Sequence, residues 1–126
     1  MVKRRLSFAV FGNASKVLES VRIWDMLEYL VRHDAEIYLD QSLYLGLRQK
    51  LAGCVSIAGV FEGVNFDVDY VISLGGDGTF LKAAGRVGAK QIPIIGVNMG
   101  RLGFLANVTP DEIRTTLDEV FEGQPE

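Results

Sequence analysis

Two glycine-rich segments contain the residues whose types and spacing could perform chemistry. The first is Gly75-Gly76-Asp77-Gly78-Thr79, which stands between an apolar run and a segment of helical periodicity. Glycines let the backbone approach a ligand closely, and the start of a helix presents unpaired N–H groups and a positive dipole to anions. A tight turn with a capping aspartate is the structural alternative, but glycines on both sides of Asp77 exceed what a cap requires. The segment therefore predicts a phosphate site.

Asp77 is the candidate catalytic residue of this segment. Phosphates that the glycines attract would repel a carboxylate, so its presence there indicates a chemical role. It could accept a proton from an attacking hydroxyl group, orient that hydroxyl, or bind the Mg²⁺ that neutralises the phosphates of a nucleotide. Lys82, in the first turn of the helix, could reach a phosphate as a point charge, and a solvated lysine is the alternative.

The second segment follows the next apolar run and is Gly96-Val97-Asn98-Met99-Gly100-Arg101-Leu102-Gly103-Phe104-Leu105. Asn98 offers both a donor and an acceptor. Phe104 offers a flat face to an adenine, or a side chain to the core. Ligands of open α/β sheets bind beyond the carboxyl ends of the strands, so the two segments could form one crevice.

The elements that must position these segments alternate between strand and helix. Apolar and β-branched runs predict strands at residues 6–11, 36–39, 69–74 and 92–97. Helical spacing predicts helices over residues 15–33, 41–50, 80–87 and 111–121, with Ser15 and Thr109 as N-caps and Pro110 at a first helical position. Residues 55–66 give no resolved pattern. Parallel strands need crossover connections, so we expect an open, mostly parallel, Rossmann-like α/β sheet with helices on both faces.

One domain accounts for the chain. Its 126 residues are near the commonest domain size, and 48% apolar with 23% charged residues is ordinary globular composition. We place the domain at residues 1–122. Residues 123–126, Gly-Gln-Pro-Glu, have the composition of a linker at a domain boundary.

Charge and composition argue against several classes of function. The net charge of −3 gives no overall field for nucleic acid or an anionic membrane. No apolar run approaches the roughly 20 residues of a bilayer span, and no signal peptide is recognisable, so we expect a cytoplasmic protein. The single cysteine, Cys54, cannot form an intramolecular disulfide and is expected to be partly buried.

Four other side chains are assigned structural roles. His33, the only histidine, is expected at a helix end as a cap or surface residue. Trp24 lies on the apolar stripe of a helix and is expected in the core. Asp67 and Asp69 could mimic a metal pair, but charges at a strand entrance are commonly solvated. No metal ligand is assigned from the protein.

The two glycine-rich segments together resemble the NAD kinase family. GGDGTFLKAA at residues 75–84 and GVNMGRLGFL at residues 96–105 match that family in order, spacing and strand context. Diacylglycerol and sphingosine kinases, and more loosely 6-phosphofructokinases, carry turns similar to the first motif, whereas the second motif separates NAD kinases from them. The resemblance is strongest over about residues 69–108.

This resemblance implies transfer of a phosphoryl group from ATP, or polyphosphate, to the 2′-hydroxyl of the adenosine ribose of NAD, giving NADP. Asp77 would be the catalytic carboxylate and Mg²⁺ the accompanying cation. Gly78 would line the NAD site, and Lys82 would match a basic position near the nucleotide. Phe104 and Leu105 would match residues on the adenosine side. The remaining residues expected to bind the nucleotide are Gly75, Gly76, Thr79 and Asn98.

The resemblance also implies that the chain is an N-terminal fragment. The family has a second, largely β domain with an Asn-Glu or Asn-Asp pair that helps hold NAD, and no such domain is present in these 126 residues. We therefore expect little or no kinase activity from the fragment alone, and a homo-oligomer in the full-length protein. A lipid kinase of the diacylglycerol type and a non-catalytic nucleotide-binding module are the alternatives.

Overall fold

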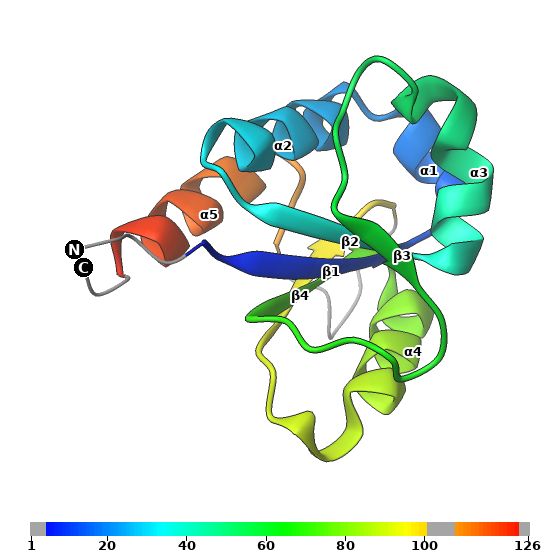
Figure 1. Ribbon diagram of the computed structural model, residues 1–126, viewed down its shortest axis with the longest axis vertical. Helices are drawn as coiled ribbons and strands as arrows, with labels where there is room; N and C mark the ends of the chain where they lie inside the picture. The colour runs from blue at the N-terminus through cyan, green and yellow to red at the C-terminus, as the bar shows by residue number, and fades with distance from the viewer. Residues whose placement is uncertain (1–4, 101–107, 124–126) are drawn as a thin grey trace.

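The described residues form an open sheet of five parallel strands with helices on both faces (Figure 1). The structure is a computed structural model that describes residues 5–100 and 108–123. The sheet order is β3-β2-β1-β4-β5, with strands β1 (Ser7–Gly12), β2 (Glu36–Asp40), β3 (Gly59–Phe61), β4 (Tyr70–Gly75) and β5 (Ile94–Asn98). Each strand pair is parallel, which confirms the predicted Rossmann-like α/β class.

In the described part of the chain, four α-helices cover one face of the sheet and one covers the other (Figure 1). The first group comprises α1 (Ala14–Glu19), α2 (Val21–Arg32), α3 (Gln41–Leu51) and α5 (Ile113–Glu122). The opposite face carries α4 (Asp77–Val87) and the segment 62–68. A short 3-10 helix, η1 (Gly88–Lys90), leads from α4 toward β5.

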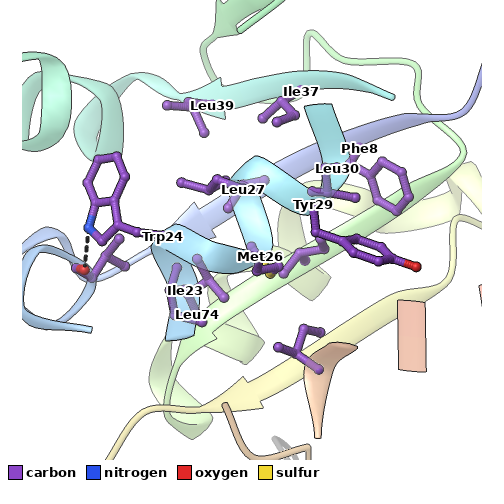
Figure 2. Packing of buried hydrophobic residues seen from close by; sticks show 14 of the residues in the cluster. Phe8, Ile23, Trp24, Met26, Leu27, Tyr29, Leu30, Ile37, Leu39 and Leu74 are labelled. Atoms are coloured by element: carbon purple, nitrogen blue, oxygen red, sulfur yellow. Dashed lines mark hydrogen bonds between the residues drawn. The ribbon is translucent and has the colours of Figure 1, made fainter. Parts of the chain in front are cut away.

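The strands send alternate side chains into two hydrophobic clusters, as the period of two in a β-strand requires. In β1, Phe8 and Val10 join the larger cluster under α2, whereas Ala9 and Phe11 join the smaller cluster under α4. Figure 2 shows the buried stripe of α2 against the strands of the larger cluster. Both faces of β1 are therefore buried, which is why its sequence is continuously apolar.

The helix predicted over residues 15–33 is in fact two helices. Ser20 takes an extended conformation between α1 and α2, and its hydroxyl accepts a hydrogen bond from the Ile23 N–H at 3.3 Å. The break rotates the apolar stripe, so Val21, the first residue of α2, is 73% exposed although it is apolar. Trp24 is buried, as predicted, and its Nε1 donates to the Val17 carbonyl at 3.0 Å (Figure 2).

Helix caps differ from the sequence prediction in two places. Asn13, not Ser15, caps α1, because its Oδ1 accepts from the Lys16 N–H at 3.3 Å. At α5, Thr109 and Glu112 exchange hydrogen bonds in a capping box, but the regular helix begins only at Ile113. Hydrogen bonding from the backbone N–H of Thr109, and to a lesser extent from its side chain, lowers the pKa of the Glu112 carboxyl.

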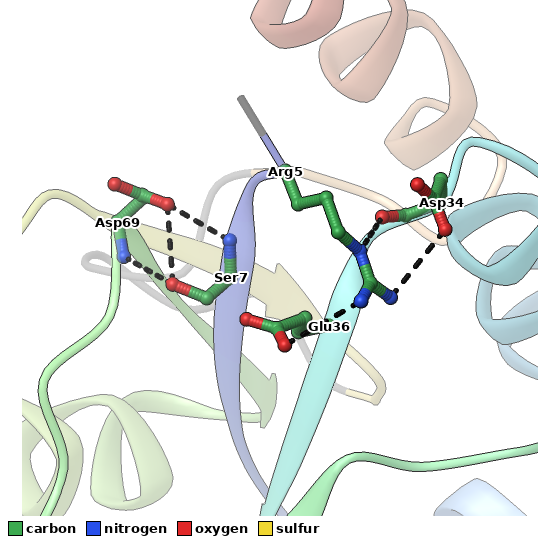
Figure 3. Close-up of polar contacts among 5 residues, drawn as sticks. All are labelled: Arg5, Ser7, Asp34, Glu36 and Asp69. Carbon is green, nitrogen blue, oxygen red and sulfur yellow. Dashed lines mark hydrogen bonds and ion pairs between the residues drawn. The ribbon is translucent and has the colours of Figure 1, made fainter. Parts of the chain in front are cut away.

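The stretch that gave no pattern contains the edge strand β3, which pairs with β2 from Tyr38↔Gly59 to Asp40↔Phe61. Cys54, just before it, is exposed rather than partly buried, because the turn after α3 carries it away from the core. Asp69 also departs from expectation. Its carboxylate accepts hydrogen bonds from the Ser7 N–H at 2.8 Å and the Ser7 hydroxyl at 3.1 Å, joining the amino ends of β1 and β4 (Figure 3).

His33 is the C-cap of α2, as predicted, and belongs to an aromatic corner between α2 and α5. Its ring stacks on Tyr29 at 4.0 Å and lies 4.8 Å from the ring of Phe121. The Tyr29 hydroxyl donates a hydrogen bond to the Asp118 carboxylate. Burial, together with this bond to Asp118, raises the pKa of Tyr29 to about 12.

The raised pKa of Tyr29 predicts a loss of stability in alkali. Below the ordinary tyrosine pKa of 10.0, folded and unfolded chains both keep the proton. Between that value and about 12 the unfolded chain loses it first, so the free energy of unfolding falls as pH rises. Urea unfolding from about pH 9 to about pH 12 should show a shallower fall in Tyr29→Phe than in the wild type. Equal slopes would contradict the assignment.

Replacing a glycine inside a helix by alanine usually stabilises the protein, but the close contact between α1 and α3 predicts the opposite at Gly46. A Cβ on Gly46 would lie 2.4 Å from the Cβ of Ala14. Gly46→Ala should lower the free energy of unfolding by about 1–3 kcal/mol through overpacking. Gly85→Ala is the control, because that site in α4 meets nothing within 4 Å and should gain about 0.5–1 kcal/mol from helix propensity. A stabilised Gly46→Ala variant would contradict the packing.

Candidate functional site

The predicted residues of the GGDG turn and Asn98 lie at the carboxyl edge of the sheet, where β1, β4 and β5 end side by side. The chain leaves β1 toward the face of α1, and it leaves β4 toward the face of α4 (Figure 1). The two connections therefore diverge around the ends of neighbouring strands. Such a switch point is where open α/β sheets form ligand crevices.

The GGDG turn stands at this switch point. Gly75 is the last residue of β4, Gly76 is the N-cap of α4, and Asp77 is its first residue. The Phe80 N–H donates to the Gly76 carbonyl at 3.0 Å and closes the first turn. Gly76 brings no side chain to the cap, and α4 points its amino end, with its positive dipole, at the edge.

The glycines of this turn have different surroundings. Gly75 is buried, and a Cβ there would lie 2.3 Å from the Oγ1 of Thr79. Gly75 thus lets Thr79 pack against the strand end. At Gly76 and Gly78, by contrast, an added Cβ would meet nothing within 4 Å. The backbone of these two residues can be approached closely, as a phosphate site requires.

Backbone hydrogen bonds join the ends of three strands at this edge. The Asn13 N–H, just after β1, donates to the Leu74 carbonyl at 3.0 Å. The Met99 N–H, just after β5, donates to the Gly75 carbonyl at 2.7 Å. The side chain of Asn98 accepts from the Gly100 N–H at 3.0 Å and so shapes the turn after β5. The two glycine-rich segments are therefore adjacent, while a ligand contact for Asn98 remains a prediction.

Lys82 lies beside the end of β2. With Asp40, Gln41, Ser42, Glu62, Gly63 and Arg86 it lines a pocket of about 200 Å³. Lys82 itself is exposed, so a long side chain is free to turn toward a ligand or toward solvent. Its contact with a nucleotide remains a prediction.

The wall of this pocket contains an ion pair that sequence analysis did not predict. The Arg86 guanidinium of α4 lies 2.6 Å from the Asp40 carboxylate, whose side chain is 5% exposed. Ser42 donates to the same carboxylate at 2.7 Å, and the Arg86 Nε donates to the Gly63 carbonyl at 2.5 Å. The pair fastens α4 to the end of β2. Residues 46 positions apart in the chain carry no local signal of such a contact.

Phe104 and Leu105 lie outside the described residues, as does Arg101. Within residues 5–100 and 108–123, no three His, Cys, Asp or Glu side chains come together as a metal site. No helix in the same part of the chain is long and apolar enough to cross a bilayer.

A family profile described as the ATP-NAD kinase N-terminal domain matches residues 24–125. The chain belongs to the NAD kinase family. This confirms the resemblance inferred from the GGDG turn at Gly75–Gly78 and the segment after β5. It also favours this family over the lipid kinases that share only the first motif.

Relatives with this family's name match along nearly the whole chain. An NAD kinase of Bacteroides fragilis is 46% identical over 117 residues, which cover 93% of this chain and 40% of the relative. An NAD kinase of Porphyromonas gingivalis is 36% identical over 115 residues, covering 91% and 40%. A bifunctional NADP phosphatase/NAD kinase of Methanococcus maripaludis is 33% identical over 116 residues, covering 90% and 20%.

A solved structure shares the fold. The crystal structure of yeast NADH kinase complexed with NADH superimposes with a TM-score of 0.73 at 18% identity, covering 95% of this chain and 39% of that one. The chain spans about 40% of the length of the two bacterial NAD kinases.

The Asp40–Arg86 pair should behave as one energetic unit. Arg86→Met should lower the free energy of unfolding by about 3 kcal/mol, because it leaves a buried carboxylate without its partner. The double variant Asp40→Asn/Arg86→Met should be more stable than the sum of the two single effects implies. Urea unfolding of the four proteins measures the coupling free energy. Additive single effects would show that the pair is not formed.

Proposed function

We propose that this chain is the part of an NAD kinase that carries the catalytic carboxylate and one wall of the nucleotide site. The observation that carries the proposal is the position of Asp77 at the amino end of α4, between two glycines with open surroundings, at the switch point of the sheet. Membership of the NAD kinase family and the names of the relatives support it. A carboxylate that can orient a hydroxyl, flanked by glycines whose backbone can approach phosphates, is the combination that phosphoryl transfer requires.

In the proposed reaction the 2′-hydroxyl of the adenosine ribose of NAD attacks the terminal phosphorus of ATP or polyphosphate. The new P–O bond forms as the bond to the leaving phosphate breaks, giving NADP and, from ATP, ADP. Asp77 orients the hydroxyl and accepts its proton. The N–H groups at Gly76 and Gly78 and the amino end of α4 hold phosphate oxygens. Positioning and charge neutralisation supply most of the catalysis.

A divalent cation fits this arrangement. Mg²⁺ is usually held by one or two carboxylates together with phosphate oxygens and water, rather than by a cage of protein ligands. In that arrangement phosphate oxygens and water would hold most of the cation, and Asp77 is the one carboxylate of the GGDG turn that could join them. When bound, the cation would neutralise charge that develops on the transferred phosphate.

The remaining parts of the proposal concern the whole protein. We propose that a second domain completes the NAD site, so that the 126-residue chain alone has little activity, and that residues 123–126 begin the linker to it. Gly75, Thr79, Lys82, Asn98, and the pair Phe104 and Leu105 are proposed to complete the nucleotide contacts on this side. The full-length protein is proposed to be a homo-oligomer. It is also proposed to be cytoplasmic, because the exposed free thiol of Cys54 is compatible with a reducing compartment.

NADP formation from ATP, Mg²⁺ and NAD tests the proposal. The full-length protein should be active and the 126-residue chain nearly inactive. In the full-length protein, Asp77→Asn should lower kcat by about 10²–10⁴-fold, because the amide cannot accept the proton. NAD binding, followed by calorimetry, should persist in this variant.

Asp25→Asn is the matched control, since Asp25 is an exposed carboxylate on α2 and should leave kcat unchanged. Full activity in Asp77→Asn would refute the catalytic assignment. Nucleotide binding without turnover in the wild-type protein would instead indicate a non-catalytic binding module.

A further inference from the structure

We propose that Lys16 of α1 is a phosphate-contacting residue of the nucleotide site, opposite the GGDG turn. This inference rests on the proposed function, because it adds a positively charged side chain to the phosphate site formed by the GGDG turn and the amino end of α4. Neither glycine-rich motif contains Lys16, which lies 59 positions before Gly75 by their residue numbers.

The ammonium group of Lys16 lies beside Gly100, in the turn after β5. A Cβ placed on Gly100 would lie 2.7 Å from Nζ of Lys16 and 3.8 Å from its Cε. The side chain therefore lies against the backbone of the turn after β5. Because β4 stands between β1 and β5 in the sheet, a side chain that starts after β1 and reaches Gly100 passes across the end of β4. That strand end is the beginning of the GGDG turn.

The neighbouring structure holds Lys16 in this direction. Its own N–H donates to Oδ1 of Asn13, which begins the helix, and the Asn13 N–H is bonded to the Leu74 carbonyl at the end of β4. The start of α1 is thus fastened to the strand that carries Gly75. The backbone beneath Nζ is fixed as well, since the Gly100 N–H is bonded to the side chain of Asn98.

The charges around Lys16 favour an external anion. The ion pairs that join described residues use Arg5, Arg22 and Arg86 as their cations. Lys50 and Lys90 lie over the rings of Trp24 and Phe66. Among the same residues, neither a carboxylate nor an aromatic ring is paired with the ammonium of Lys16, which lies instead against a glycine.

A lysine at this edge of the sheet would offset the negative charge of Asp77 toward a bound phosphate. The amino end of α4 approaches the crevice from one face of the sheet, and Lys16 approaches it from the other. Asp77 lies at the same edge and would repel a phosphate. A compact ammonium with three donors offsets that repulsion, and its flexible stem can follow the phosphate oxygens during transfer.

Two bound groups could supply the phosphate, namely the oligophosphate of the donor and the pyrophosphate of NAD. Both present the same oxygens to an ammonium. Steady-state kinetics separate them, because the variant should lose kcat/KM for the substrate whose phosphate Lys16 contacts. The full-length protein would be assayed with ATP varied at saturating NAD, and with NAD varied at saturating ATP.

We expect Lys16→Met to lower kcat/KM for one of these substrates by about 10- to 100-fold, which is the loss of one hydrogen bond to a charged group. Lys16→Arg, which keeps the charge, should recover most of the loss. Lys90→Met is the matched control, because Lys90 lies in η1, which precedes β5 and is therefore at the opposite edge of the sheet. It should leave both parameters unchanged.

These measurements separate failure of the proposed kinase activity from failure of the proposed role of Lys16. A wild-type protein that forms no NADP would refute the proposed function. An active wild type with unchanged kcat/KM for both substrates in Lys16→Met would refute the role of Lys16 alone, as would an equal loss in Lys90→Met. A loss confined to ATP would assign the lysine to the donor, and one confined to NAD would assign it to the dinucleotide.

Discussion

The parallel pairing of β1 with β4 is the constraint on which the rest of the molecule depends. Its register runs from Phe8↔Tyr70 to Gly12↔Leu74, so both strands end at the same edge. Right-handed crossovers then send the chain after β1 to one face and the chain after β4 to the other. The two connections diverge at this edge, which is where open α/β sheets generally bind their ligands. β4 brings the GGDG turn to that point, and with it Asp77, the carboxylate proposed to be catalytic.

The sequence predicted those features that depend on neighbours in the chain. Continuous apolar runs identified β1 and β4 because both faces of these strands are buried, and the apolar run of β5 identified it although it lies at the edge of the sheet. Glycines beside Asp77 identified the turn because a helix cap needs fewer of them. The break at Ser20 was missed because apolar residues recur at roughly helical spacing on both sides of it. In the structure the two helices bury different faces, and Val21 is exposed. β3 was missed because it is three residues long and lies at the edge of the sheet.

The parts of the site that could not be predicted are those made by contacts across the fold. Asp40 and Arg86 are ordinary charged residues in the sequence, and only the packing of α4 beside β2 joins them. Both ends of α4 are therefore fixed, its first turn by Thr79 against Gly75 and its last turns by Arg86. A carboxylate that must orient a hydroxyl requires such a support, because small displacements from the reactive geometry cost rate steeply. If Asp77 has the proposed role, the ion pair would support its position through α4 without contacting a ligand.

An acidic chain must rely on local rather than overall charge to bind the polyanionic substrates proposed for it. The net charge of −3 opposes the approach of ATP and NAD at long range. Salt screens exposed charges over a Debye length of about 8 Å at physiological ionic strength, so acidic groups elsewhere on the surface have little effect within the crevice. What a bound phosphate experiences there is the amino end of α4, the N–H groups of the glycines and the nearest cations. The proposed binding therefore depends on the few groups that the ends of β1, β4 and β5 bring together at this edge, and not on the net charge.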